Sequence, residues 1–283
     1  MDNVCPLEGL ERLLLATDGS KFSEGAIREA LSLAKQCASR LTAISVVQTN
    51  LEFEAAIPQM DEKWEDEALK HLESIKEKAS REGIACKIMA VRGEEPHQEI
   101  VHAAEQNQVN MIIVGRHGRT GLLRLLMGSV TAKVIGHTPC SVLVVPPDAK
   151  IECRNILIAT DGSRYSGAAA REAIGIAKKC GSSLVVLSVA SSETELRSAR
   201  DNVQKVIDAG KIEGVLIEAV TLIGRPYEVI VNTSRQKRAD LIIVGSHGRT
   251  GLERLLIGSV AERVIGHSET AVLIAKVKMH DAW

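Results

Sequence analysis

Glycines and hydroxyl-bearing residues recur in one fixed pattern at two places in the chain, and this pattern could bind phosphate. The copies are Gly115-Arg116-His117-Gly118 with Gly128-Ser129-Val130, and Gly245-Ser246-His247-Gly248 with Gly258-Ser259-Val260. In each copy an apolar run precedes the first glycine and a helical pattern follows the last one. Backbone N–H groups at a helix start carry partial positive charge, and glycine lets a ligand approach the backbone closely. The duplicated loop therefore predicts two phosphate-binding sites.

An aspartate follows the first apolar run of each copy. Asp18 lies in the segment LLLATDGS (13–20), and Asp161 lies in the matching segment ILIATDGS (156–163). One interpretation is that the carboxylate contacts the base or ribose of a nucleotide, or a metal bound to its phosphates. The other is that the Asp-Gly-Ser turn only makes local hydrogen bonds before a helix. The residues alone leave both open.

The serines and histidines of the loops also have simpler interpretations. Ser259 and Glu262 have the spacing of a capping box, so the hydroxyl could only cap a helix, although Ser129 has Ala132 in that place. His117 and His247 occur once per copy without further metal ligands nearby, which does not predict a metal site. Each histidine side chain could either orient a ligand or pack within its loop, and the sequence favours neither role.

Motifs of several enzyme classes are missing from the sequence. No lysine follows Gly128 or Gly258 as a Walker A loop requires, and no G-x-G-x-x-G follows the first strand. There is also no G-x-S-x-G segment and no repeated pair of carboxylates. These absences disfavour P-loop hydrolases, dehydrogenases and serine hydrolases.

The six cysteines contain no C-x-x-C pair, and we expect all of them to be free thiols. Cys37 and Cys180 occupy equivalent positions near the end of the first helix of each half. A small buried apolar side chain is the expected role of a cysteine at such a position.

Composition excludes several kinds of partner. The formal net charge of the 283 residues is -1 and aromatic residues make up 2%, so neither a basic surface nor a stacking platform for nucleic acid is expected. The first residues lack the pattern of a signal peptide, and no apolar run is long enough to cross a bilayer. We expect a cytoplasmic protein that binds neither nucleic acid nor membrane.

Self-comparison predicts two domains. Residues 11–20 (ERLLLATDGS) align with residues 154–163 (RNILIATDGS), and Pro146-Pro147 begins a short connector between the halves. The predicted domains are residues 1–149 and 150–283. The second copy is 13 residues shorter between its aspartate and its glycine loop, since the offset between copies falls from 143 to 130. We expect most of this loss in the loop after the second strand.

Strands and helices alternate strictly in each half. The apolar runs predict strands at 13–17, 41–47, 84–91, 111–114, 141–145, 156–160, 184–189, 215–222, 241–244 and 271–275. This order predicts two tandem Rossmann-like, doubly wound α/β domains with parallel strands and helices on both faces. If the first and fourth strands are neighbours, Asp18 meets Gly115 and Asp161 meets Gly245 across a crevice at the strand ends.

The sequence resembles the universal stress protein family in its tandem form. The resemblance is carried by Ala-Thr-Asp-Gly-Ser at the first strand, G-x-x-G-x9-G-S at the fourth, and a second strand ending in Ser-Val. It implies a five-stranded parallel sheet of order 3-2-1-4-5 and an ATP site in each half. It assigns Asp18 and Val46 to adenosine, Gly115 and Gly118 to ribose and phosphate, Gly128, Ser129 and Val130 to the phosphates, and Asp161, Val189, Gly245, Gly248, Gly258, Ser259 and Val260 to the second site. Arg116 departs from the small residue that Ser246 supplies.

These observations lead to one functional expectation and two alternatives. We expect a regulatory protein of the stress response that binds ATP, or ADP or AMP, with Mg²⁺ carried by the nucleotide and with slow or no hydrolysis. The alternatives are an ATP hydrolase or adenylate-transferring enzyme, and a structural adaptor that binds nucleotide only for stability. We expect the fifth strands, 141–145 and 271–275, to pair the halves as an intramolecular pseudo-dimer. A homodimer and an unidentified protein partner are further expectations.

Overall fold

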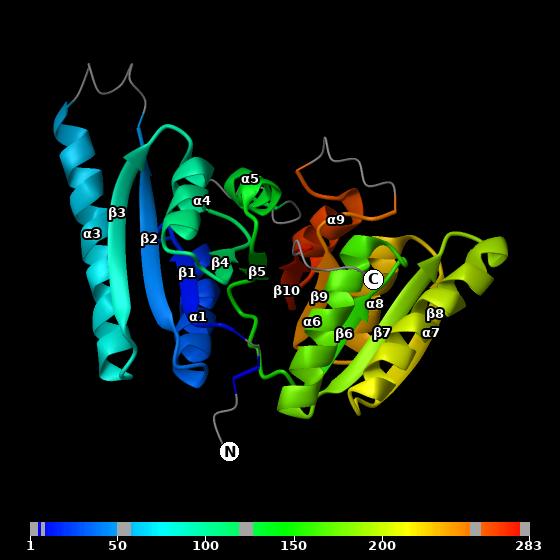
Figure 1. Cartoon of the computed structure of the whole chain (residues 1–283). Coiled ribbons are helices and arrows are strands. Elements are labelled where there is room, and N and C mark those ends of the chain that lie inside the picture. The colour runs from blue at the N-terminus through cyan, green and yellow to red at the C-terminus, as the bar shows by residue number, and fades with distance from the viewer. Residues whose placement is uncertain (1–4, 7–8, 50–57, 119–126, 250–255, 278–283) are drawn as a thin grey trace.

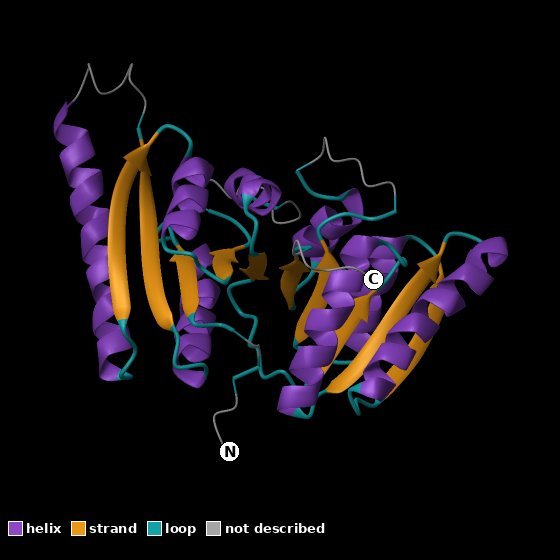
Figure 2. Ribbon diagram, viewed as in Figure 1, coloured by secondary structure: helices purple, strands orange, loops and turns teal. Residues whose placement is uncertain are grey.

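The chain folds into one ten-stranded sheet covered by helices on both faces (Figures 1 and 2). The computed structural model describes residues 5–6, 9–49, 58–118, 127–249 and 256–277. The strands are β1 (Arg12–Ala16), β2 (Arg40–Gln48), β3 (Cys86–Gly93), β4 (Met111–Gly115), β5 (Ser141–Val145), β6 (Asn155–Ala159), β7 (Ser183–Ala190), β8 (Ile217–Ile223), β9 (Leu241–Gly245) and β10 (Ala271–Ala275).

Helices connect successive parallel strands within each half. The described helices are α1 (Glu24–Gln36), α3 (Pro58–Arg81), α4 (Pro96–Gln106), α5 (Ser129–His137), α6 (Arg164–Cys180), α7 (Leu196–Ile212), α8 (Pro226–Gln236) and α9 (Ser259–His267), with short 3-10 turns η1 (Lys21–Ser23) and η2 (Glu193–Glu195). Both α4 and α8 begin at a proline, whose missing N–H is not needed in the first turn.

The strand order confirms the predicted fold class. It runs β3-β2-β1-β4-β5-β10-β9-β6-β7-β8, so each half has the order 3-2-1-4-5. Every pairing within a half is parallel, and β1 lies between β2 and β4 with Ala16 opposite Val114. The short strands can occupy these central places because they are apolar on both faces. The exact division between residues 149 and 150 stays a prediction.

The halves join through their fifth strands, as predicted. β5 and β10 lie side by side at the centre of Figure 1 and pair antiparallel, with Val144 opposite Val272 and Val142 opposite Ile274. In an isolated half β5 or β10 would be an exposed edge strand, and here each of the two strands covers the other. The two halves form an intramolecular pseudo-dimer.

The sheet separates two apolar cores that both run through the two halves. Because side chains alternate across a strand, Leu13 and Leu15 pack on one face while Leu14 packs on the other. The first face is covered by α1, α3, α6 and α7, and the second by α4, α5, α8 and α9. The carboxyl ends of the strands are not covered by these helices, and the aspartate turns and glycine loops lie there.

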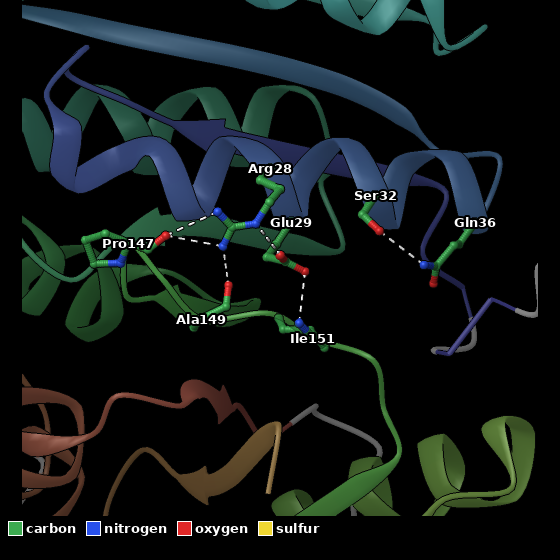
Figure 3. A network of polar contacts seen from close by, with 7 residues as sticks. All are labelled: Arg28, Glu29, Ser32, Gln36, Pro147, Ala149 and Ile151. Carbon is green, nitrogen blue, oxygen red and sulfur yellow. Dashed lines mark hydrogen bonds and ion pairs between the residues drawn. The ribbon is translucent and has the colours of Figure 1, made fainter. Parts of the chain in front are cut away.

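The connector between the halves is bound to helix α1 (Figure 3). The Arg28 guanidinium donates hydrogen bonds to the carbonyl oxygens of Pro147, at 3.2 and 3.3 Å, and of Ala149. The buried Glu29 carboxylate accepts from Arg28 Nε at 3.0 Å and from the Ile151 N–H at 3.2 Å. The connector after Pro146 is therefore held in place by polar contacts as well as by its short length.

Two sequence-based expectations are wrong. Cys5 and Cys37 form a disulfide, so the six cysteines are not all free thiols and Cys37 is not simply a small apolar side chain. The shortening of the second half falls mainly in a helix, because α3 has 24 residues and α7 has 17, a difference of seven out of thirteen. The start of this helix is hard to predict from its long amphipathic pattern, because Asp61 and Glu62 before Trp64 are helical as well.

Among the helices that the structure describes, none combines the length and the apolarity that a bilayer span requires. The cytoplasmic location stays a prediction.

Candidate functional site

Each half contains a cavity at the carboxyl ends of its first and fourth strands. The cavity of the first half, between β1 and β4, has a volume of about 380 Å³. The cavity of the second half, between β6 and β9, has a volume of about 470 Å³. Both volumes lie in the range of small-molecule sites. The cavities therefore lie where the topology and the loop chemistry together placed the predicted sites.

Most of the predicted site residues line these cavities. In the second half all seven do: Asp161, Val189, Gly245, Gly248, Gly258, Ser259 and Val260. In the first half Asp18, Val46, Gly115, Gly118 and Val130 do, whereas Gly128 and Ser129 are not among the described residues that line the cavity. Residues 119–121 and 250–251 of the repeated Gly-Arg-Thr-Gly segment lie outside the described part of the chain.

The aspartates serve the turn and face the glycine loop at the same time. Oδ1 of Asp18 accepts the Ser20 N–H at 3.0 Å, and Oδ1 of Asp161 accepts the Ser163 N–H at 3.0 Å. One oxygen of each carboxylate therefore makes the local hydrogen bond of the Asp-Gly-Ser turn, as one of the two interpretations predicted. A Cβ built on Gly118 would lie 3.0 Å from Asp18 Oδ2, so the other oxygen points at the loop after β4.

Close approach of the backbone requires glycine at the ends of β4 and β9. A Cβ on Gly115 would lie 2.8 Å from the carbonyl oxygen of Phe22, and one on Gly245 would lie 2.6 Å from the carbonyl carbon of Tyr165. Phe22 and Tyr165 follow the aspartate turns of their halves. The aspartate turn and the glycine loop therefore lie close together in each half, but the aspartates approach Gly118 and Gly248 and not Gly115 and Gly245.

The serines are the first residues of their helices and not the capping residues. Gly128 and Gly258 occupy the N-cap positions, and their carbonyl oxygens accept the N–H groups of Ala132 and Glu262 at 3.0 Å each. The capping-box interpretation of Ser259 is thus wrong. Both serine side chains are exposed, and Ser259 lines its cavity.

The histidines pack within their loops. His117 is buried, with its ring edge-on to Phe22 at a centroid distance of 6.1 Å. The ring of His247 lies 5.0 Å from that of Tyr165. Both histidines also line their cavities, so loop packing is established and contact with a ligand is compatible with it.

Sequence reasoning missed several cavity residues, among them Arg249, Trp64 and Glu195. Arg249 holds the turn of Asp161, with its backbone N–H 2.9 Å from Oδ2 and its Nε 2.9 Å from the backbone oxygen. Trp64 of α3 lines the first cavity, and Glu195 of η2 lines the second. Arg249 could have been found from its place between the glycines. The other two come from segments that differ between the copies and show no motif.

The two cavities differ in charge and aromatic character at the end near the second strand. The exposed Trp64 offers an aromatic face in the first cavity. Glu195 accepts the Ser191 N–H at 3.0 Å, and this hydrogen bond lowers the pKa of its carboxyl, so the second cavity carries a negative charge there at neutral pH. The first site is better suited to stack an uncharged base.

Arg116 links the loop of the first half to the second half. Its Nη1 donates to the carbonyl oxygens of Ser268 at 2.8 Å and Gly266 at 3.3 Å, at the end of α9. Burial lowers the pKa of the guanidinium from its ordinary value. The hydroxyl of the corresponding Ser246 contacts its neighbour His247, at 3.1 Å from Nδ1. The departure noted in the sequence is therefore a contact across the pseudo-dimer.

Within the described ranges no group of three histidine, cysteine, aspartate or glutamate side chains is arranged to hold a metal ion. Phosphate-bound Mg²⁺ typically needs only one or two carboxylates. Asp18 and Asp161 could supply one carboxylate each to an ion that arrives with a nucleotide.

The fold and the paired cavities define a tandem doubly wound α/β protein with one glycine-lined crevice per repeat. The profile of the universal stress protein family matches residues 9–146 and 152–276. The chain therefore belongs to the universal stress protein family.

Named relatives agree with this assignment. Universal stress protein MJ0531 of Methanocaldococcus jannaschii is 37% identical over 139 residues, covering 44% of this chain and 82% of the relative. Universal stress protein Rv2005c of Mycobacterium tuberculosis is 25% identical over 288 residues, covering 93% and 96%. The crystal structure of a universal stress protein from Archaeoglobus fulgidus superposes with a TM-score of 0.76 at 23% identity, covering 95% of this chain and all of that one, and shows the same fold.

Proposed function

We propose that this protein binds ATP in both halves and acts as a regulatory protein of the stress response. The observation that carries the proposal is that two separate cavities are built from equivalent residues at equivalent strand ends. Each has an aspartate turn, a glycine loop and a helix start on its lining or border. A helix start with exposed N–H groups and an adjacent hydroxyl is a favourable place for phosphate.

The remaining cavity residues fit the other parts of a nucleotide. Val46 and Val189 lie on apolar walls that suit a base, and the aspartates lie near them at the same strand ends. Arg249 adds a positive charge close to the loop of the second site. ATP, ADP and AMP share these groups and differ in the number of phosphates that reach Ser129 or Ser259. Mg²⁺ would arrive with the phosphates.

Asp18 is the one carboxylate among the described residues that line the first cavity, and in the second cavity Asp161 and Glu195 both accept hydrogen bonds from backbone N–H groups. We therefore propose slow or absent turnover, with signalling through a protein partner. Association of two copies into a homodimer belongs to the same proposal.

Calorimetric titration with MgATP tests the proposal directly. We expect a stoichiometry near two per chain, with loss of one site in Ser129→Glu and of the other in Ser259→Glu. The new carboxylate repels phosphate, yet both positions are exposed and an acidic residue favours a helix start, so the fold is retained. Ser129→Gln and Ser259→Gln are the matched controls for size without charge. No heat of binding in the wild-type chain would refute the proposal.

A further inference from the structure

The structure contains two pairs of cysteines at corresponding ends of its halves. In the first half Cys5 is bonded to Cys37, which directly follows α1. In the second half Cys180 is the last residue of α6 and packs against the core cluster that contains Cys153, which lies just before β6. Cys37 and Cys180 are equivalent in the repeat, but their partners come from different positions.

A hydrogen bond of the same kind shows that the partners are not equivalent. Ser39 donates its hydroxyl to the carbonyl oxygen of Leu10, and Ser182 donates to that of Cys153. Leu10 therefore stands where Cys153 stands in the second half. Each half therefore has a cysteine near the end of the equivalent helix, but this cysteine comes from a different position of the repeat in each half.

The surroundings of the second pair distinguish its two thiols. Cys153 is buried in the core, and its backbone has the left-handed conformation (φ 52°) that few residues other than glycine adopt. Cys180 is partly exposed at the helix end. The hydrogen bond from Cys153 lowers the pKa of Cys180 and raises that of Cys153. Because Cys180 is partly exposed and Cys153 is buried, Cys180 is the thiol that an external disulfide reaches first.

We propose that Cys153 and Cys180 are a second thiol–disulfide couple, which a low-molecular-weight disulfide oxidises reversibly. This inference does not depend on nucleotide binding. It gives the chain a modification site in the second half that corresponds to the disulfide of the first half.

The reaction balances as two exchanges. The Cys180 thiolate attacks one sulfur of the external disulfide, forms a mixed disulfide and releases one thiolate. Cys153 then loses its proton and attacks Sγ of Cys180, which forms the bond between the two cysteines and expels the second thiolate. The two protons of the cysteine pair end on the released thiolates. The protein loses two electrons, and the external disulfide becomes two thiols.

Glutathione and glutathione disulfide provide the test on the full chain. The reduced protein is equilibrated at a series of ratios, quenched with acid, alkylated, and mapped by mass spectrometry. We expect a peptide linked through Cys153 and Cys180, while the thiols of Cys86 and Cys140 are alkylated. Alkylation of both Cys153 and Cys180 at ratios that close the Cys5–Cys37 bond would overturn the proposal.

Two single substitutions test the order of attack. Cys153→Ser should leave glutathione trapped on Cys180, because the second thiol is missing. Cys180→Ser should leave Cys153 alkylated after denaturation and without glutathione, because burial protects it. Cys140→Ser is the control and should form the Cys153–Cys180 link as the wild type does. Glutathione on Cys153 but not on Cys180 would refute the assigned roles.

Discussion

Replacing Val144 by lysine tests the junction between the halves. Val144 is 1% exposed and lies opposite Val272 in the antiparallel pair of β5 and β10. Lysine at this place would put an ammonium group into the apolar core that includes Val142 and Ile274. No carboxylate belongs to that described core cluster, so the charge would have no partner within it.

The expected loss of stability follows from burial. Removing the buried valine side chain costs about 1.5–3 kcal/mol, and an uncompensated buried charge costs on the order of 3–5 kcal/mol. Part of the second cost is relieved if the lysine side chain reaches solvent or loses its proton. We expect the free energy of unfolding to fall by about 4 kcal/mol.

Urea denaturation followed by circular dichroism measures this change. The matched control is Ile212→Lys, because Ile212 is 85% exposed at the end of the outer helix α7. An exposed substitution of this kind typically changes stability by less than about 0.5 kcal/mol. Equal midpoints for Val144→Lys and Ile212→Lys would show that the fifth strands do not hold the halves together.

Four further outcomes are expected. MgATP should quench the fluorescence of Trp64, which lines the first cavity, and Ser129→Glu should remove the quenching while Ser259→Glu retains it. Turnover of ATP should stay well below the several per second of ordinary enzymes, and a rate in that range in a phosphate-release assay would contradict a binding role. Glu29→Gln should lower the free energy of unfolding by about 1.5–3 kcal/mol, because a buried charged acceptor of the connector is lost, whereas the exposed Glu73→Gln should not. Burial lowers the pKa of His97, so its neutral form is stabilised by folding; stability should fall as the pH drops below the unfolded value of about 6.5, and His97→Gln should flatten that slope in melting experiments.

The strands and their meeting points could be predicted because they depend on local patterns. Runs such as 111–114 are apolar throughout, which identifies central parallel strands, and β4 is indeed buried along its length. The pairing of β5 with β10 followed from the edge position that the family resemblance implied for the fifth strand. Repetition strengthened both predictions, since each pattern occurred twice.

The remaining features depend on contacts between segments with no shared motif. Trp64 reaches the first cavity only because α3 packs beside β2, and nothing in the sequence near it indicates a site. The Cys5–Cys37 bond joins residues 32 apart in sequence whose spacing matches no motif. The capping-box error arose because Ser259 and Glu262 fit the pattern one residue later than the true N-cap.

The contact of Arg116 with the end of α9 has an evolutionary consequence. In a dimer of two identical chains, every substitution at a symmetric interface appears twice, so a new side chain must be tolerated on both sides of the axis. In a fused chain it appears once, and the opposite position can keep its original residue. Arg116 reaches Ser268 across the junction, whereas Ser246 is a small residue at the equivalent position of the other half. A dimer of two identical chains could not have this difference. Fusion therefore lets the two crevices differ within one molecule while a single ten-stranded sheet joins them.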